Sequence, residues 1–296
     1  RDHKRDHKRD HGRDHKEDHT RDHQRDDTRD ENGVPTGTGQ RLVDYDKETV
    51  EAIENGYKGL HLDDTLQIFA SIYQYDYDGY QDELEQFDPI RGAGANFVSN
   101  ADGITNKGFE IEIYYAATDR LTLSGNFSYT DTEYGEDYLV FMVDDPVNPV
   151  PVFGQCTQGY ISCEVDNPSF AEDYTVNLKG GPLKGIPEIK HTMRATYESD
   201  SPFGPLWWVL SHSYTGDFSA SGIQRALDRI EARETTNLSA TWYSEDGTMS
   251  ARAYIDNLFD NKNYYSLGTG DHETNYNRTV GALSPRTMGV DVRYKF

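Results

Sequence analysis

The residues that could most plainly do chemistry are the histidines of a four-residue repeat at the start of the chain, RDHKRDHKRDHGRDHKEDHTRDHQRDDT. On a helix, residues four positions apart lie on one face, so two imidazoles there could chelate zinc, nickel or copper. Nothing else in the repeat fixes that geometry, so we favour solvated histidines and expect no cofactor. If the repeat does bind a metal ion, the candidate ligands are His3, His7, His11, His15, His19 and His23.

Another pair of histidines lies among serines, which are residue types found in hydrolases. Side chains on a strand alternate between two faces, so His191 falls with Met193 on an apolar face. His212 falls with Leu210 in the same way. A general base must lie beside its nucleophile in a wet pocket, so the sequence predicts no catalytic residue and no enzyme. The nearby candidate partners would have been Ser211, Ser213 and Asp217.

Two cysteines, Cys156 and Cys163, stand in the segment CTQGYISC, within a stretch rich in Pro, Asp and Gly. A small disulfide loop formed in an oxidising compartment is the preferred interpretation, and two free thiols are the alternative. The segment belongs to the longest stretch between two alternating segments. A disulfide would therefore order that connection rather than the rest of the fold.

Carboxylates and aromatic residues supply the remaining candidates. Glu110 and Glu112 share one face of an alternating segment and could form an acid pair, but ordinary residues of a wet wall are favoured. Aromatic side chains beside many carboxylates would suit stacking on a ligand, with a belt at a membrane interface as the alternative. These ligand candidates are Tyr75, Tyr77, Tyr80, Tyr134, Tyr138, Phe141, Phe153 and Tyr160.

The elements that must position these residues are strands, because apolar and polar residues alternate along much of the chain. In the closing segment PRTMGVDVRYKF, one face carries Met288, Val290, Val292, Tyr294 and Phe296. Nine segments of this kind are ETVEAIENGYKG, TLQIFASIYQYDY, GFEIEIYYA, LTLSGNFSYT, IKHTMRATYE, LWWVLSHSYTG, TTNLSATWYS, TMSARAYIDNLF and the closing one.

The connections between these segments are of two lengths. GLHLDD, TD, SDSPFG and EDG are short, whereas the stretches at about residues 79–103, 132–188, 217–233 and 264–285 are long. Strict alternation of short turns with long loops is typical of outer-membrane β-barrels. The residues predicted to lead the lipid-facing side are Leu66, Ile68, Ile111, Ile113, Leu121, Leu123, Leu238, Trp242, Val290 and Val292.

Composition agrees with a barrel and excludes other classes. Hydrophobic residues make up 35% of 296 residues, which is low for a soluble core of that size, while 21 tyrosines suit a membrane interface. No apolar run approaches the roughly 20 residues of a membrane helix. The net charge of −23 argues against a nucleic-acid partner and suits cationic ones. We expect a disordered repeat at 1–32, a linker at 33–46 and strands at 47–296.

Three stretches resemble TonB-dependent outer-membrane receptors. NLFDNKNYYS and PRTMGVDVRYKF resemble the closing two strands of that family, and ETVEAIENGYKGLHLDDTLQIFASIYQYDYDGYQ resembles a hairpin from the middle of its barrel. The resemblance covers about residues 44–296. It implies an all-β, antiparallel transmembrane barrel, with this chain supplying about nine strands at the carboxyl-terminal end of a larger barrel of 22.

The resemblance also implies a function and partners. Such receptors hold an amino-terminal plug inside the barrel and use the TonB complex to import scarce ligands such as ferric siderophores, cobalamin or carbohydrates. It implies a place in the bacterial outer membrane, among lipid and lipopolysaccharide, and barrel assembly machinery that reads the closing strand through Tyr294 and Phe296. This sequence shows neither a plug nor a TonB box, so we expect a fragment of a receptor. The alternative is a small self-contained barrel with a structural or adhesive role.

Overall fold

The computed structural model describes residues 45–88, 93–141, 175–222, 226–269 and 278–296. The histidine repeat, both cysteines, Phe153 and Tyr160 lie outside the described residues. Contacts divide the chain into a first unit, Arg1–Leu42, and a second, Val43–Phe296, and everything below concerns the second. The division into repeat, linker and strands at 1–32, 33–46 and 47–296 stays a proposal.

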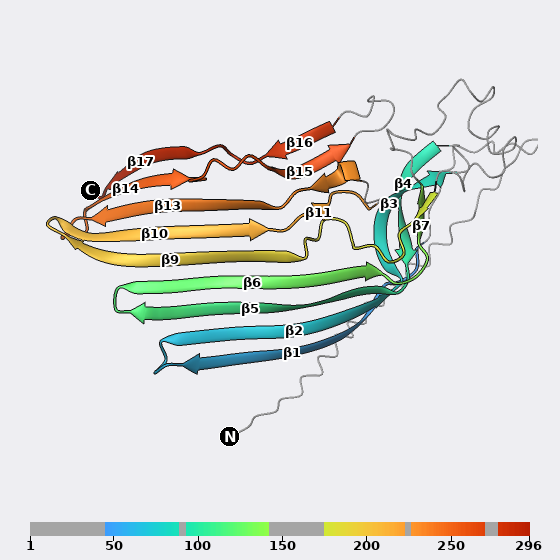
Figure 1. Cartoon of the computed structure of the whole chain (residues 1–296), viewed down its shortest axis with the longest axis horizontal. Coiled ribbons are helices and arrows are strands. Elements are labelled where there is room, and N and C mark those ends of the chain that lie inside the picture. Colours follow the sequence, from blue (N-terminus) through green and yellow to red (C-terminus); the bar gives the residue numbers. More distant parts are fainter. Residues whose placement is uncertain (1–44, 89–92, 142–174, 223–225, 270–277) are drawn as a thin grey trace, which may run out of the picture. The chain divides into compact units, whose positions relative to one another are not determined.

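Nine strands form the main sheet, and their order in the sheet is their order in the sequence (Figure 1). Every neighbouring pair is antiparallel, as the resemblance implied. The strands are β1 (Thr49–His61), β2 (Leu66–Asp78), β5 (Ile104–Thr118), β6 (Leu121–Tyr134), β9 (Ile189–Ser201), β10 (Gly204–Thr215), β13 (Arg233–Tyr243), β14 (Met249–Asp256) and β17 (Thr287–Tyr294).

Short turns and long connections alternate strictly along this sheet, which confirms the sequence prediction. The short turns are residues 62–65, 119–120, 202–203 and 244–248. In the first of them Leu62, Asp63 and Asp64 all have positive φ angles, between 53° and 67°. Non-glycine residues seldom adopt this left-handed region, so the turn between β1 and β2 holds a tight and specific backbone path.

The long connections, which the sequence predicted to be loops, contain strands of their own. Each connection forms one two-stranded sheet, so backbone groups beyond the main sheet pair locally instead of remaining unpaired. These pairs are β3 (Tyr80–Asp88) with β4 (Ala93–Ala101), β7 (Leu139–Phe141) with β8 (Thr175–Asn177), β11 (Phe218–Ser219) with β12 (Arg229–Ile230), and β15 (Tyr264–Thr269) with β16 (Arg278–Ala282). A short 3-10 helix, η1, spans Ala226–Asp228.

The buried core does not lie on the main sheet but at its long-connection end. Its members come from two connections, β2–β5 and β6–β9, and the adjoining strand ends, and they pack into one cluster. Among the described residues, no helix is long and apolar enough to cross a membrane. The core cluster consists of Ala101, Ile104, Tyr134, Tyr138, Val140, Leu178 and Leu183.

Candidate functional site

The main sheet has one continuous apolar face, which follows from the strand register. Directly paired residues project to the same side of a sheet, and Ile68 pairs with Ile113 while Leu210 pairs with Leu238. Following the register from strand to strand puts all ten predicted lipid-facing residues on this face. Val290 remains 70% exposed. A large exposed apolar surface of this kind needs a non-aqueous neighbour.

The height of the apolar face matches a lipid bilayer. On β6 its residues run from Leu121 to Tyr129, which is within the range of about 9–11 residues that a tilted strand needs to span the hydrocarbon layer. Beyond Tyr129, the next residue on this face is Asp131, whose carboxylate lies 3.1 Å from the Lys107 ammonium. At the short-turn end, an ion pair joins Arg120 to Asp200 at 2.7 Å.

Aromatic residues line the apolar face near the short turns. The indole N–H of Trp242 donates to the Phe203 carbonyl at 2.9 Å, and that of Trp208 donates to the Ser199 hydroxyl at 3.2 Å. Both indoles therefore present an apolar body with a satisfied polar tip, which is the arrangement favoured at a membrane interface.

A second row of rings crosses the apolar face nearer the long connections, and it contains both candidate histidines. The His191 ring lies 5.1 Å from Tyr214 and 5.5 Å from His212 between ring centres. His212 shares a 3.0 Å hydrogen bond with the Thr236 hydroxyl. Both rings lie on the apolar face, which confirms the parity argument, and Ser211 lies on the other face. A wet base-and-nucleophile pair is therefore not formed.

The opposite face of the sheet is polar, as a wet wall requires. Glu110 pairs with Ser71 and Ser128, and Glu112 pairs with Asn126, so the two carboxylates lie among hydroxyl and amide groups. No ion pair involves either carboxylate within the described ranges. A cavity of about 630 Å³ follows this face, and the charged residues that line it are Glu54, Lys58, Glu110, Glu112 and Lys190.

The aromatic ligand candidates separate into two groups. Tyr75 and Tyr77 belong to β2, within the predicted strand segment TLQIFASIYQYDY, and they lie on the polar side near the long connections. Tyr80 opens β3, 5.5 Å from Tyr77 between ring centres. Burial, followed by the Asp82 carboxylate, raises the pKa of Tyr80, so its hydroxyl keeps its proton.

The second group consists of Tyr134 and Tyr138. Both side chains are buried and cannot stack on a ligand, which corrects the prediction that they are ligand contacts. Tyr134 is fully buried, and its hydroxyl donates to the Asp82 carboxylate at 2.6 Å. Tyr138 is 8% exposed, and its hydroxyl lies 2.5 Å from Ser99. Desolvation raises the pKa of Tyr134, followed by the bond to Asp82. Nothing in the sequence pattern distinguished these tyrosines from the accessible ones, because their burial depends on how two connections fold against each other.

The Asp82 carboxylate is nearly buried and joins separate segments. The Lys184 ammonium lies 3.1 Å from it and also donates to the Glu83 carbonyl at 2.6 Å. This arrangement connects the β3–β4 hairpin, the end of β6 and the segment before β9. The β2–β5 and β6–β9 connections are therefore held together by a specific polar network as well as by the apolar cluster.

The NLFD segment at residues 257–260 holds three parts of the chain together through Asn257. Asn257 is 4% exposed and has a φ of 51°, a left-handed conformation that Asn tolerates better than most residues. Its side-chain N–H groups donate to the carbonyls of Asn261 and Ser284, and its side-chain oxygen accepts from the Asn261 amide. Its own amide donates to the Asn237 side chain at 2.8 Å. One residue thus holds the end of β14, the start of β13 and the approach to β17.

Asp260 adds hydrogen bonds that connect this segment to the closing strand. Its carboxylate accepts a 3.0 Å hydrogen bond from the Arg286 amide, directly before β17, and the Arg286 side chain reaches the Leu258 carbonyl. The Arg286 amide, helped by the Lys262 ammonium, lowers the pKa of Asp260. The closing residues Tyr294 and Phe296 lie at the other end of β17, with ring centres 5.1 Å apart.

Comparison with known proteins identifies the family to which the main sheet belongs. The family described as "TonB dependent receptor-like, beta-barrel" matches residues 24–258. The comparison with curated proteins gives no match. Three similar solved structures, each 14–15% identical, are the ferric yersiniabactin uptake receptor FyuA from Yersinia pestis (TM-score 0.58), the siderophore receptor PiuA from Acinetobacter baumannii (0.56) and the copper transporter OprC (0.53).

These structures share the fold of this chain over part of their length. The match covers 84%, 83% and 84% of this chain, but only 30%, 28% and 31% of the three receptors in the same order. The chain therefore spans about 30% of the length of the structures that it matches. Since the family model covers most of the sequence and the nine-stranded sheet has the faces of a membrane wall, the chain belongs to the TonB-dependent receptor β-barrel family of bacterial outer-membrane receptors and transporters, which are not enzymes.

Proposed function

We propose that this chain forms part of the barrel wall and mouth of a receptor that imports a scarce ligand with energy from the TonB complex. The observation that carries the proposal is the sheet with one bilayer-high apolar face and one polar face, ending in hairpins on one side only. A ferric siderophore, cobalamin or a carbohydrate is the ligand class in question. PiuA, named as a siderophore receptor, and FyuA, named as a ferric yersiniabactin uptake receptor, support the first of these.

The ligand would meet this chain at the long-connection end of the polar face. Tyr75, Tyr77 and Tyr80 carry rings there that are only partly buried. Phe141, Phe153 and Tyr160 remain proposed contacts of the same kind. A disulfide between Cys156 and Cys163 would order the longest connection, and finding both thiols free in protein isolated from membranes would reject it.

The proposed partners follow from the same arrangement. The apolar face contacts outer-membrane lipid and lipopolysaccharide, and the barrel assembly machinery recognises the closing strand through Tyr294 and Phe296. The TonB complex acts through a plug that fills the barrel beside the polar face. In the described residues β1 and β17 are not paired with each other, so these nine strands form no closed barrel. This observation counts against the alternative of a small self-contained barrel.

Uptake by cells that produce the intact receptor tests the proposal. Radiolabelled ferric siderophore, cobalamin or oligosaccharide should accumulate only with an energised TonB system. Tyr75→Ala should weaken ligand binding, whereas Tyr114→Ala, the same change on the same face but near the short turns, should leave it unchanged. Uptake that persists without TonB would contradict the proposed function. Equal effects of the two substitutions would contradict ligand binding at the long-connection end of the polar face.

A further inference from the structure

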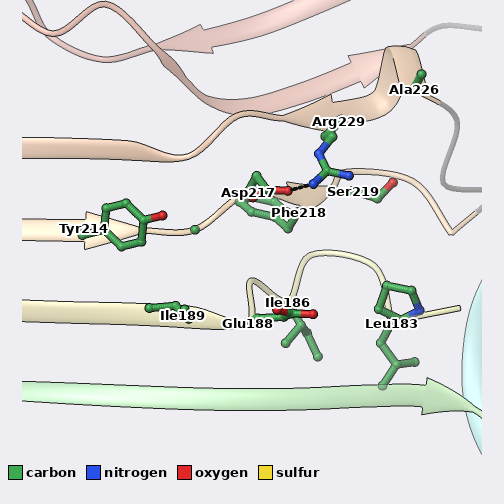
Figure 2. A pocket seen from close by; sticks show the side chains of 12 residues that line it. Leu183, Ile186, Glu188, Ile189, Tyr214, Asp217, Phe218, Ser219, Ala226 and Arg229 are labelled. Atoms are coloured by element: carbon green, nitrogen blue, oxygen red, sulfur yellow. Dashed lines mark hydrogen bonds and ion pairs between the residues drawn. The ribbon is translucent and has the colours of Figure 1, made fainter.

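A smaller cavity of about 280 Å³ lies beyond the start of β9 and the end of β10, between two long connections (Figure 2). Ile189 and Tyr214, the residues of the apolar face nearest this end of the two strands, form one part of its lining. Leu183 and Ile186 add aliphatic surface from the connection before β9. The cavity shares only Tyr214 with the lining of the one that follows the polar face, and the uptake proposal does not use it.

Backbone hydrogen bonds hold the cavity walls in place. The Gly185 amide donates to the Ser219 carbonyl and the Gly216 amide to the Ile189 carbonyl, each at 2.8 Å. The Ala220 amide donates to the Asp228 carbonyl at 2.9 Å. The first two bonds tie the two connections to each other and to β9, and the third closes the β10–β13 connection on itself. A site held in this way is formed before a ligand arrives, which lowers the entropy cost of binding.

The charges of the lining favour a cation over an anion. The Arg229 guanidinium donates to the Asp217 carboxylate, so each charge already has its partner (Figure 2). Glu188 lines the same cavity, and within the described part of the chain its carboxylate makes neither an ion pair nor a hydrogen bond. Two carboxylates and one guanidinium leave a net charge of about −1. A phosphate or carboxylate would compete with Asp217 for Arg229 and would be repelled by Glu188.

The volume of the cavity and its aliphatic wall limit the hydrocarbon part of the ligand. The cavity is slightly smaller than the range of about 300–1,000 Å³ that is typical of small-molecule sites, so it suits a single ring or a short chain. We propose that this cavity binds a small organic ammonium ion, with Glu188 accepting hydrogen bonds from the ammonium group and the aliphatic wall covering the hydrocarbon body. The ammonium group belongs either to a free amine or to a lipid headgroup.

Binding of phenethylamine to the intact receptor in detergent micelles, measured by calorimetry, tests this site. Glu188→Gln should weaken binding by at least about tenfold, because it removes the one charge without a partner among the described residues that line the cavity. Glu231→Gln changes an exposed carboxylate in a neighbouring connection, outside the lining, and should leave binding unchanged. Ile186→Ala should weaken phenethylamine more than it weakens methylamine, since it shortens only the apolar wall. Heat-modifiable gel migration checks that each variant is folded.

Two comparisons complete the test. 3-Phenylpropionate, which carries a carboxylate in place of the ammonium group, should not bind. Vesicles containing phosphatidylethanolamine displace the probe if a lipid headgroup is the natural occupant, and phosphatidylcholine vesicles serve as the matched control; displacement by neither assigns the site to a free amine. Equal affinity of phenethylamine for Glu188→Gln and the unmodified receptor, binding of 3-phenylpropionate, or no saturable binding of phenethylamine would overturn the proposal.

Discussion

At the scale of single residues, Asn257 shows how one side chain determines the position of a strand. Its amide side chain uses both its donors and its acceptor on backbone groups that lie before and after the β15–β16 hairpin. Alanine can make none of these bonds, and it tolerates a positive φ less well than Asn does. The partly buried carbonyl and amide of Asn261 would then be left without these hydrogen bonds, which costs more than the bonds themselves contribute.

We therefore expect Asn257→Ala to destabilise the folded receptor by roughly 2–4 kcal/mol, given about 1–3 kcal/mol for each buried group left unpaired. Asn55→Ala, at an exposed position in the middle of β1, is the matched control and should change stability little. Urea unfolding followed by heat-modifiable gel migration measures both. Equal unfolding midpoints for the two variants would show that the hydrogen bonds of Asn257 do not stabilise the folded receptor.

The hydrogen bond between the Arg286 amide and the Asp260 carboxylate should be sensitive to acid. The Arg286 amide lowers the pKa of Asp260 below its ordinary value of 3.8, so the ionised carboxylate is favoured in the folded state. This contribution is complete above the ordinary pKa and is lost as the pH falls through the folded-state pKa. Exchange of the Arg286 amide should therefore be constant from pH 7 to 5, after correction for intrinsic rates, and rise below the ordinary pKa. Asp260→Asn should remove that rise, and a variant that retained it would assign the rise to another group.

Tyr134 makes a corresponding contribution within the core cluster. Tyr134→Phe removes the 2.6 Å hydrogen bond to the Asp82 carboxylate, and a bond to a charged group contributes roughly 1.5–3 kcal/mol. The amide of Gly180, which donates to the Tyr134 carbonyl, should then exchange roughly 10- to 150-fold faster. Tyr243→Phe, at an exposed tyrosine near a short turn, should leave that amide unchanged. Unchanged exchange in Tyr134→Phe would mean that the connections are held by apolar packing alone.

At the scale of elements, the two faces of each strand determine which substitutions are tolerated. Ile113→Arg puts a charge on the apolar face near the middle of the bilayer, where it costs roughly 2–4 kcal/mol. Glu112→Arg, one position earlier on the same strand, changes the polar face and should be tolerated. Heat-modifiable migration of the assembled receptor compares the two. Normal assembly of Ile113→Arg would contradict the assignment of this face to lipid.

The sequence predicted these strands well because their alternation is a local property of the chain. Parity alone placed Ile68, Ile113 and Leu238 on one face, and the register confirms that placement. The hairpins in the long connections were missed because segments such as residues 80–88 are too polar to alternate clearly. The burial of Tyr134 was missed for a different reason: it arises from contacts between segments far apart in the sequence, and neither composition nor spacing reports such contacts.

At the scale of the whole molecule, the main sheet has two unpaired edges, at β1 and β17, within the described residues. In a bilayer each unsatisfied backbone group costs several kcal/mol, so these edges require partner strands. The chain produced by itself in liposomes should therefore pair with other copies or aggregate, and should not transport. Cross-linking and uptake of labelled ligand measure these outcomes. Energy-dependent uptake by the chain alone would show that no further strands or plug are needed.

The unequal connections at the two ends of the sheet also affect how this wall can diverge during evolution. At one end the strands are joined by only two to five residues, so an insertion there would shift the register and exchange the apolar and polar faces. At the other end, paired hairpins can lengthen at their tips at a small entropic cost. Sequence change should therefore accumulate at the hairpin tips, and a short peptide epitope inserted there should be displayed without loss of assembly.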